Sequence, residues 1–424
     1  MSVFPLIWLK LESNTVKKMG ADIIDADVII VGGGMVGLSM AASLVASDLS
    51  VLVIEKDAIK QDQLKKQLAD SKIEPENYFT RVSAISPGNQ RFLQELGCWQ
   101  NIPPSRLSDY EAMFVWDGEG LGNIEFRADE IGERHLGSIV ENEIIRTAIL
   151  AYLEKQPNIH FLCESSIHAI NLKSSSVEIA FDNNKSIKAR LLIGADGALS
   201  RIRKLTGIAL SQNAYNQIAM VANVKTEKPH QSTAWQKFNT SGPVAFLPMP
   251  DPNVCSIVWS LDENEVEKLD LNDNEKFAEA LNAHFDHKLG KLTLISQVGR
   301  FPLIKRHAQT YLAERCVLIG DAAHTIHPLA GQGVNLGFQD VQSLARLLTG
   351  LQSKGRDIGL KANLRSYERE RASENHIMQE AMSGFKWMFG QRDKSIISIR
   401  NLVMGMLDRT TTAKEMLIRR AMGL

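Results

Sequence analysis

The sequence predicts an α/β protein in which a doubly wound parallel domain is interrupted by a β-rich domain and followed by helices. Four observations predict this fold. A buried strand runs into a glycine-rich turn near the N-terminus, and a second strand ending in Gly320-Asp321 returns to the same domain late in the chain. Between them, residues 218–259 hold short β patterns separated by prolines, and the pattern from Gln339 onward is mainly helical.

The doubly wound domain is expected to be discontinuous, since its strands flank the β-rich segment in the sequence. Its expected limits are 25–105, 130–210 and 300–350, with 106–129 and 211–299 in the β-rich domain and 351–424 in the helical C-terminal region. Residues 1–24 are expected to form a flexible extension. Their apolar stretch precedes their lysines, which is the reverse of the order in a secretory signal.

Composition excludes several classes of protein. The chain has 424 residues and a net charge of -1, so it is long enough for two domains and carries no overall field that attracts nucleic acid. Its four cysteines are widely spaced and form no C-x-x-C pair, which argues against zinc sites and disulfides and fits a reducing cytoplasm. No apolar run reaches transmembrane length.

The first motif is a dinucleotide fingerprint. Residues 27–31 read as a buried strand, residues 32–37 fit G-x-G-x-x-G, and a second strand ends in Glu55. Gly32 permits the turn, Gly34 lets a pyrophosphate approach the helix N-terminus, and Gly37 lets helix and strand pack closely. A glycine-rich turn in another doubly wound sheet is the alternative. The predicted cofactor contacts here are Gly32, Gly34, Met35, Val36, Gly37, Glu55 and Lys56.

The second motif follows the strand 316–320. Asp321 ends this strand, where its carboxylate can bond the ribityl hydroxyls of a flavin, although capping of the next turn would also explain it. Pro328 stiffens the following turn, and residues 331–333 open a helix whose positive end suits a reduced, anionic flavin. The two motifs together therefore indicate a flavin. The predicted contacts here are Asp321, Pro328, Gly331, Gly333, Val334 and Asn335.

A third motif completes a resemblance to a known family. Residues 196–203 fit D-G-x-x-S-x-x-R, although Asp196-Gly197 alone would be an ordinary turn. With all three motifs in order over nearly the whole chain, the sequence resembles the class A flavoprotein monooxygenases, which have a para-hydroxybenzoate hydroxylase-like fold. Residues 322–337, 81–86 and 140–142 resemble the ubiquinone-biosynthesis hydroxylases within that class.

The resemblance implies a Rossmann-like FAD-binding domain, FAD as the resident cofactor, and NADPH or NADH as a transient co-substrate. It implies that Asp196 lies near the pyrophosphate and that Arg81 lies near the flavin. It also implies ring hydroxylation of a polyprenylated quinol or phenol by a flavin hydroperoxide formed with dioxygen. Such a ring is already activated, so no general base is assigned. The candidates for one are Tyr215, His307 and Glu141, and a structural role is the favoured interpretation of each.

Two further features suggest additional roles. His324 and His327 have the spacing of a metal pair, but no third ligand follows and Pro328 breaks the helix, so no metal site is predicted. Phe246, Leu247, Pro248 and Trp259 are expected to form a lid over the flavin.

The C-terminal helices suggest a contact outside the enzyme itself. In residues 386–420, Lys and Arg outnumber Asp and Glu eight to three, and apolar residues lie among them. This mixture is typical of an interfacial helix, which implies peripheral contact with the inner membrane or a biosynthetic complex. A helical pair packed on the core is the alternative.

Two competing functions remain open at this point. One is a non-catalytic flavoprotein scaffold of the ubiquinone-synthesis complex. The other is a different flavin oxidoreductase that acts on an apolar substrate, although the W-x-W-x-I-P segment of flavin halogenases is absent.

Overall fold

The structure is a computed structural model that describes residues 26–59, 74–183, 185–325 and 333–423. Its first layer is an eight-stranded sheet whose central strands are parallel and lie in the order β19, β11, β1, β2, β8. These strands are β1 (Ala26–Val31), β2 (Val51–Ile54), β8 (Ile159–Leu162), β11 (Ser186–Gly194) and β19 (Cys316–Leu318). Antiparallel strands β18 (Leu312–Ala313), β9 (Ile167–Leu172) and β10 (Val177–Phe181) complete it.

Helices cover this sheet and bury its central strands. All four residues of β2 are buried, and β1 is buried except at one position, which explains their continuous apolar sequences. Helix α1 packs on both α4 and α8. The helices are α1 (Met35–Ser43), α4 (Asn142–Leu153) and α8 (Gly333–Ser353).

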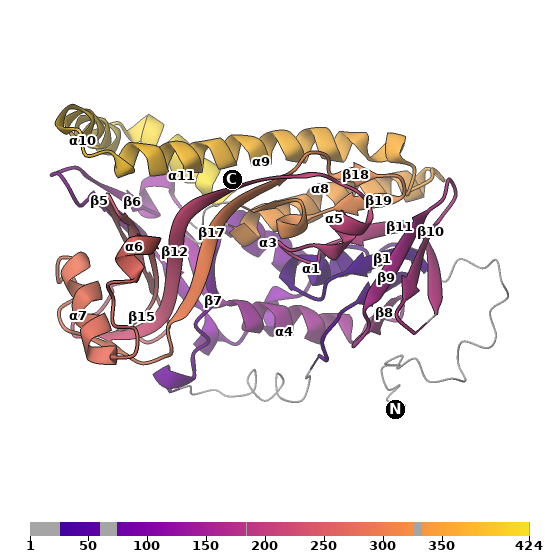
Figure 1. Ribbon diagram of the computed structural model, residues 1–424, viewed down its shortest axis with the longest axis horizontal. Coiled ribbons are helices and arrows are strands. Elements are labelled where there is room, and N and C mark those ends of the chain that lie inside the picture. Colours follow the sequence, from indigo (N-terminus) through magenta and orange to yellow (C-terminus); the bar gives the residue numbers. More distant parts are fainter. Residues whose placement is uncertain (1–25, 60–73, 184, 326–332, 424) are drawn as a thin grey trace.

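The second layer is a nine-stranded, mostly antiparallel sheet in the order β20-β17-β12-β15-β14-β13-β5-β6, with β16 beside β12. Strands β12 (Leu210–Thr226) and β17 (Gly299–Ala308) arch from this sheet toward the eight-stranded sheet (Figure 1). The others are β5 (Ala112–Asp117), β6 (Asn123–Arg127), β13 (Thr233–Asn239), β14 (Gly242–Pro248), β15 (Val254–Asp262), β16 (Leu292–Leu294) and β20 (His324–Thr325). Helices α6 (Glu263–Val266) and α7 (Asn274–His284) cover its outer face.

A small sheet joins the two layers. Its strands are β3 (Val82–Ile85), β7 (Gly137–Glu141) and β4 (Ser108–Tyr110), and α3 (Pro87–Glu95) follows β3. Ala84 and Ile139 of this sheet pack against Ala245 and Leu247 of β14 in one buried cluster. Ile85 and Val140 are buried in the core cluster of the eight-stranded sheet, so the small sheet contacts both larger sheets.

One strand differs from the expected domain division. Residues 300–308 were expected in the doubly wound domain, but β17 pairs with β12 from Leu210↔Ala308 to Val221↔Gly299 and so belongs to the nine-stranded sheet. Its partner lies far earlier in the chain. The alternation of β17 predicts a strand but carries no information on which sheet it joins.

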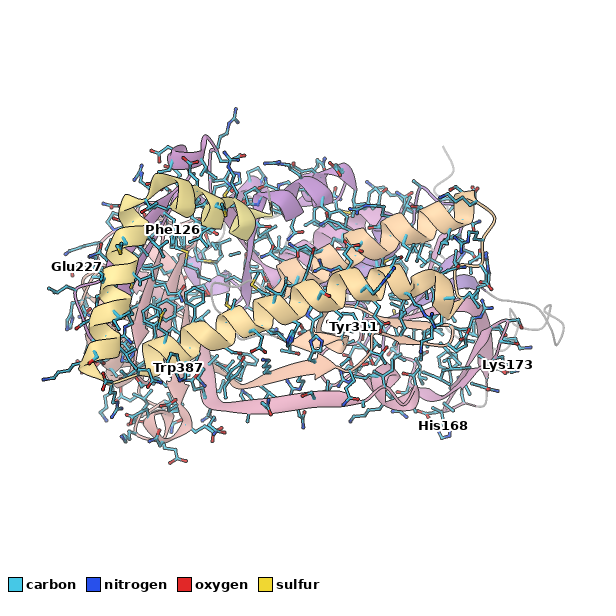
Figure 2. All side chains as sticks on the ribbon, turned by 90° about the horizontal axis from the view of Figure 1, so that it is seen from above. Phe126, His168, Lys173, Glu227, Tyr311 and Trp387 are labelled. Atoms are coloured by element: carbon cyan, nitrogen blue, oxygen red, sulfur yellow. The ribbon has the colours of Figure 1, made fainter. Side chains whose placement is uncertain are left out.

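Three helices form the C-terminal region. Helix α9 (Lys361–Gly390) runs along the molecule, and α10 (Lys394–Arg409) and α11 (Thr411–Met422) turn across its end (Figures 1 and 2). Met404 of α10 is buried with Phe389 and Phe238, and Ile418 of α11 is buried with Ile131. Within the described part of the chain, none of the helices has the length and apolarity needed to span a bilayer.

Candidate functional site

The motif turns meet at one edge of the parallel sheet. Strands β2, β1, β11 and β19 are consecutive neighbours, and their carboxyl ends lead directly into Glu55, Gly32, Asp196 and Asp321 respectively. Ligands of doubly wound sheets bind at this edge. Segments that are far apart in the sequence therefore line one site, as an extended dinucleotide requires.

The glycines of the first turn divide into two kinds. A Cβ on Gly32, whose φ is +117°, would lie 2.3 Å from the backbone oxygen of Ala195, and one on Gly37 would lie 2.0 Å from the backbone oxygen of Gly32. A Cβ on Gly34 would have no atom within 4 Å. Gly32 and Gly37 are thus required by the fold. Gly34 leaves open space at the N-terminus of α1, which fits a pyrophosphate.

Glu55 and Arg146 bracket the glycine turn. One carboxylate oxygen of Glu55 accepts a 2.6 Å hydrogen bond from the backbone N–H of Gly33, and the Nε of Arg146 donates to the backbone oxygen of Gly33 at 2.7 Å. The sequence reading missed Arg146. The signal in the sequence was a single basic residue within the apolar segment that forms α4. This segment is distant from the first motif in the sequence and meets it only in the folded protein. Lys56 is exposed and lies 3.9 Å from Asp57.

Val36 connects the first motif to the second. Its side chain lies 3.1 Å from the position of a Cβ on Gly320 and 2.6 Å from that of a Cβ on Gly337. Gly320 also has a φ of +59°, so neither glycine accepts a larger residue without displacement of α1. Val36 and Met35 are both partly buried in this junction of α1, the Asp321 turn and α8.

The carboxyl group of Asp321 faces outward at the edge of the sheet. Asp321 is exposed to solvent, but the protein atoms around its carboxyl displace part of the water, and this desolvation raises the pKa. The charges of His324, Arg81 and Arg306 act to lower it. Arg81 is exposed beside it, with its guanidinium 5.5 Å from the centre of the Phe301 ring. An exposed acceptor next to a cation fits the hydroxyl-bearing chain of a flavin.

The side chain of Asp196 is engaged within its own turn. One carboxylate oxygen accepts from Ser200 Oγ at 2.5 Å, and the other accepts from the backbone N–H groups of Arg201 and Ile202 at 2.6 and 3.0 Å. Asp196 therefore accepts from the first turn of the short helix α5 (Arg201–Leu205), whose N-cap is Ser200. Gly197 in the same turn has a φ of +81°, and a Cβ there would have no atom within 4 Å.

The start of α8 offers backbone rather than side-chain groups. A Cβ on Gly333 would have no atom within 4 Å, and Val334 is half-buried. Asn335 is buried, and its side-chain amide donates to the backbone oxygen of Ala84 at 2.7 Å and accepts from the backbone N–H of Ser86 at 3.1 Å. Asn335 thus anchors the helix to β3. The predicted contacts Pro328 and Gly331 lie outside the described residues.

The residues considered as bases have structural partners. Glu141 is buried, accepts two 2.8 Å bonds from Arg106 and accepts from the backbone N–H of Phe79 at 2.6 Å. The Nζ of Lys386 lies 4.6 Å from the centre of the Tyr215 ring. Burial lowers the pKa of His307, and the charges of His324 and of His376 act in the same direction.

His324 bonds within the fold. Its Nε2 lies 2.6 Å from a carboxylate oxygen of Asp340. Among the described residues, no three His, Cys, Asp or Glu side chains gather as a metal-binding group.

Two of the four residues expected to form a lid, Phe246 and Trp259, pack elsewhere. Phe246 stacks on Phe285 with ring centres 3.8 Å apart, and Trp259 packs on Phe277, so both lie on the α7 side of the sheet. Side chains alternate along a strand, which sends these two residues to the opposite face from Leu247. The face toward Arg81 instead presents Phe301, with Val221 and Val258 paired on neighbouring strands.

Comparison with known proteins agrees with this geometry. A family model described as an FAD binding domain matches residues 165–381, and one described as an NAD(P)-binding Rossmann-like domain matches residues 30–59. The chain is 34% identical to the 3-demethoxyubiquinol 3-hydroxylase of Escherichia coli (strain K12) over 398 residues, which is 94% of this chain and 98% of that protein.

The chain belongs to the ubiquinone-biosynthesis hydroxylases, a family of FAD-dependent monooxygenases. The human mitochondrial ubiquinone biosynthesis monooxygenase COQ6 is 33% identical over 439 residues, covering 92% of this chain and 91% of that protein. The p-nitrophenol 4-monooxygenase PnpA of Pseudomonas putida DLL-E4 shares the fold, with a TM-score of 0.74 over 93% of this chain, 98% of that chain and 18% identity.

The resemblance that the sequence predicted is confirmed, including the similarity to the bacterial demethoxyubiquinone hydroxylase. The predicted fold class, with its Rossmann-like FAD-binding domain, is also confirmed. This hydroxylase is a flavoenzyme whose cofactor is FAD.

Proposed function

We propose that this hydroxylase uses NADPH or NADH and dioxygen to hydroxylate the ring of a polyprenylated quinol or phenol intermediate of ubiquinone biosynthesis. The observation that carries the proposal is the convergence of three flavin motifs at the carboxyl ends of adjacent strands, next to an apolar sheet face. Bound FAD supplies the redox chemistry and the activation of oxygen. The protein binds, orients and shields the reactants.

We assign the cofactor contacts by the groups that are free at the site. The backbone N–H groups beside Gly34 would meet the pyrophosphate. Each carboxylate oxygen of Glu55 accepts one backbone N–H, from Gly33 or Asp57, and its remaining lone pairs would accept from the adenosine ribose. Asp321 would accept from the ribityl hydroxyls. The N-terminus of α8 at Gly333 would face the pyrimidine side of the ring, where its positive end stabilises negative charge.

The proposed ring site lies between Arg81 and the nine-stranded sheet. Phe301 is 39% exposed there, and Val221 and Val258 are half-buried on the same face. Apolar side chains exclude water from a substrate ring, which matters because water diverts activated oxygen to hydrogen peroxide. We assign no catalytic base, since Glu141 is committed to Arg106.

The test is coupled turnover. Purified hydroxylase should be yellow and should oxidise NADH or NADPH faster when a short-chain demethoxyquinol is added. Under labelled dioxygen, one labelled oxygen should enter the product ring. A yellow protein that oxidises the nicotinamide without transferring oxygen to any quinol would indicate a scaffold or another oxidoreductase and would refute the proposal.

We further propose that the enzyme meets the membrane through α10, because its substrate carries a polyprenyl chain. In α10 an arginine faces the protein and large apolar side chains face outward, which is the reverse of an ordinary surface helix. Arg400 is 1% exposed and faces the protein, where its guanidinium bonds both carboxylate oxygens of Asp117 at 2.7 Å. The outward face carries Ile399 at 61% exposure, Leu402 at 64% and Met406 at 59%.

Neighbouring segments extend this apolar surface. Trp387, near the end of α9, is 63% exposed where the chain turns into α10, and its ring suits a membrane interface (Figure 2). Leu121, in the turn between β5 and β6, is 96% exposed, and the adjacent Gly122 bonds to Asn401 of α10. Exposed Arg392 and Lys394 lie at the start of α10 and fit anionic lipid headgroups.

Vesicle binding tests this surface separately from catalysis. The full-length enzyme should sediment with phosphatidylglycerol vesicles and weakly with phosphatidylcholine vesicles. Replacing both Leu402 and Met406 with Ser should weaken binding roughly tenfold and leave turnover of a water-soluble quinol unchanged. Leu360→Ser, at an exposed leucine before α9, is the matched control. Unchanged sedimentation of the double variant, or self-association in place of vesicle binding, would refute the membrane contact.

A further inference from the structure

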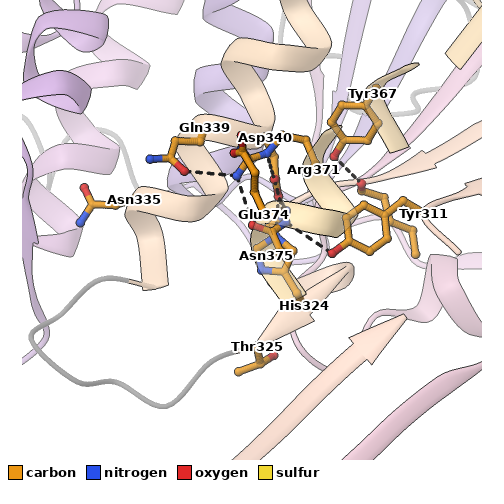
Figure 3. A network of polar contacts seen from close by, with 12 residues as sticks. Tyr311, His324, Thr325, Asn335, Gln339, Asp340, Tyr367, Arg371, Glu374 and Asn375 are labelled. Carbon is orange, nitrogen blue, oxygen red and sulfur yellow. Dashed lines mark hydrogen bonds and ion pairs between the residues drawn. The ribbon is translucent and has the colours of Figure 1, made fainter. Parts of the chain in front are cut away.

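Behind the Asp321 turn lies a buried carboxylate with an unusual number of donors. Asp340 of α8 is fully buried, and one of its oxygens accepts from the backbone N–H of Gly320 at 2.9 Å and contacts His324 Nε2 at 2.6 Å (Figure 3). The other oxygen accepts from Arg371 Nε at 2.8 Å and Asn375 Nδ2 at 3.2 Å. Every partner except Gly320 is a side chain that is itself buried.

If these buried charges served only to stabilise the fold, apolar residues could do so without the free-energy cost of removing charges from water. Transfer of an ion pair from water to a protein interior costs several kcal/mol per ion, and well-packed apolar residues are often at least as stable. Here Asp340 and Arg371 are 0% and 3% exposed. His324 and Arg371 hold the pKa of Asp340 at about 2 against the opposing effect of burial, so the group is a carboxylate at neutral pH.

The hydrogen bond from Gly320 to Asp340 is directional, so it fixes the position of the backbone at Gly320 more narrowly than apolar packing does. It fixes the backbone immediately before Asp321 to a point two turns into α8, the helix that begins at Gly333. Val36 of α1 packs against Gly320 and Gly337 at the same junction. The three segments that line the proposed flavin site are therefore held in one geometry around Asp340.

Helix α9 secures the other side of the carboxylate. Arg371 and Asn375 lie one turn apart on its buried face, and the amide of Asn375 also contacts the hydroxyl of Tyr311 at 3.3 Å. Tyr367 donates to the backbone oxygen of Leu318 at 2.9 Å, at the end of β19 (Figure 3). The backbone that leads into Asp321 is thus bonded at Leu318 by α9 and at Gly320 by α8.

We propose that Asp340 is a positioning residue for the flavin: held between Arg371 and His324, it fixes the Gly320–Asp321 turn where Asp321 meets the cofactor. The inference rests on the proposed placement of FAD at this turn. It differs from a purely stabilising role in what it predicts. Loss of the carboxylate should weaken FAD binding and alter the flavin's surroundings more than it weakens the fold.

Asp340→Asn is the main test, because an amide keeps the size of the side chain and replaces one acceptor oxygen with a donor. Two of the four donors then face an N–H group. FAD titration of the apoprotein, followed by flavin fluorescence, should give an affinity at least tenfold lower, which is about 1.4 kcal/mol. The visible circular dichroism of the reconstituted variant should change, because the flavin sits in an altered setting.

Glu374→Gln is the matched control. Glu374 accepts from Nη1 of the same Arg371, whereas Asp340 accepts from its Nε, and the Glu374 side chain is 57% exposed. This variant should bind FAD like the wild type. If Asp340→Asn binds FAD as tightly as the wild type, with the same spectrum and only a lower melting temperature, the network is merely structural and the proposal is wrong.

A second pair of variants covers the case in which Asp340→Asn does not fold. His324→Gln retains a donor that can reach Asp340, and His324→Leu does not. The Leu variant should lose FAD affinity and the Gln variant should recover most of it; equal affinities for the two would refute the proposal. Failure of the wild type itself to bind FAD would refute the proposed function instead, so the two failures are distinguishable.

Discussion

The guanidinium of Arg203 donates a 2.7 Å hydrogen bond to the backbone oxygen of Ala322, and this bond joins the Asp196 turn to the Asp321 turn. A second bond, 3.0 Å long, runs from the same guanidinium to the backbone oxygen of Ala198. Arg203 is 3% exposed, and burial lowers its pKa, while the charge of Asp196 acts to raise it. Two motifs that are separated by more than a hundred residues are thus one structural unit.

Replacing Arg203 with Met should loosen both turns together. The change leaves the buried oxygen of Ala322 and the partly buried oxygen of Ala198 without their donor. A buried unsatisfied acceptor costs about 1–3 kcal/mol, and a partly buried one costs less because water can reach it. We expect a loss of about 2–4 kcal/mol in the free energy of unfolding, measured by urea denaturation of the apoprotein. Arg203→Lys should lose less, since one ammonium can reach one of the oxygens. Equal stability of wild type and Arg203→Met would contradict this account.

Alanine at two glycines of the first motif should have opposite consequences. Gly34→Ala adds a methyl group where no atom lies within 4 Å, so the variant should fold with normal stability and bind FAD at least tenfold more weakly. Gly37→Ala places a methyl group 2.0 Å from the backbone oxygen of Gly32, so it should lower the yield of folded protein. Thermal melting of the apoproteins and FAD titration separate the two effects.

The sequence predicts the turns that form the site, but it does not predict the arginine side chains that bond these turns to the rest of the protein. The turns at Gly32, Asp196 and Asp321 were predicted because each follows an apolar strand, and parallel topology brings their carboxyl ends together. Arg146 and Arg371 could not be assigned in this way. Each lies on a helix whose spacing predicts burial but not which backbone group or carboxylate it will meet.

The fold shows the same division between local and long-range information. The alternation of residues 299–308 predicts a strand, whereas the pairing of β17 with β12 depends on contacts across the chain. The composition of residues 386–420 indicates an amphipathic region, but the inward orientation of Arg400 depends on the distant Asp117. The spacing of apolar residues predicts where a helix or strand lies, whereas contacts with distant parts of the chain determine which of its faces is buried.

Stability should decline in mild acid through His284. Burial, assisted by the charge of Lys237, lowers the pKa of His284 from 6.5 to about 4, and the ring bonds to the amide of Asn239 at 2.7 Å. Below pH 6.5 the unfolded chain takes up a proton that the folded protein refuses, so stability falls until about pH 4 and is unaffected above pH 6.5. The loss attributable to this group is at most about 3 kcal/mol.

Urea midpoints between pH 8 and pH 4 measure this effect. His284→Gln has no titrating ring, so its stability should fall less than that of the wild type across this range. His230 and His307, whose pKa values are also lowered by burial, remain in both proteins and set a common background. Parallel pH profiles for the two proteins would show that His284 does not contribute.

Breaking the ion pair between Arg400 and Asp117 should release α10 from the β5–β6 hairpin. Arg400→Met leaves a fully buried carboxylate without its cation, which typically costs 3–5 kcal/mol. Limited proteolysis should then cut the chain near the start of α10, at residues 391–394, before the rest of the enzyme unfolds. A double variant, Arg400→Met with Asp117→Leu, removes both charges and should recover most of the resistance to proteolysis. If Arg400→Met is cut no faster than the wild type, the pair does not hold the helix, and the outward apolar face of α10 must be maintained by the packing of Met404 against Phe389.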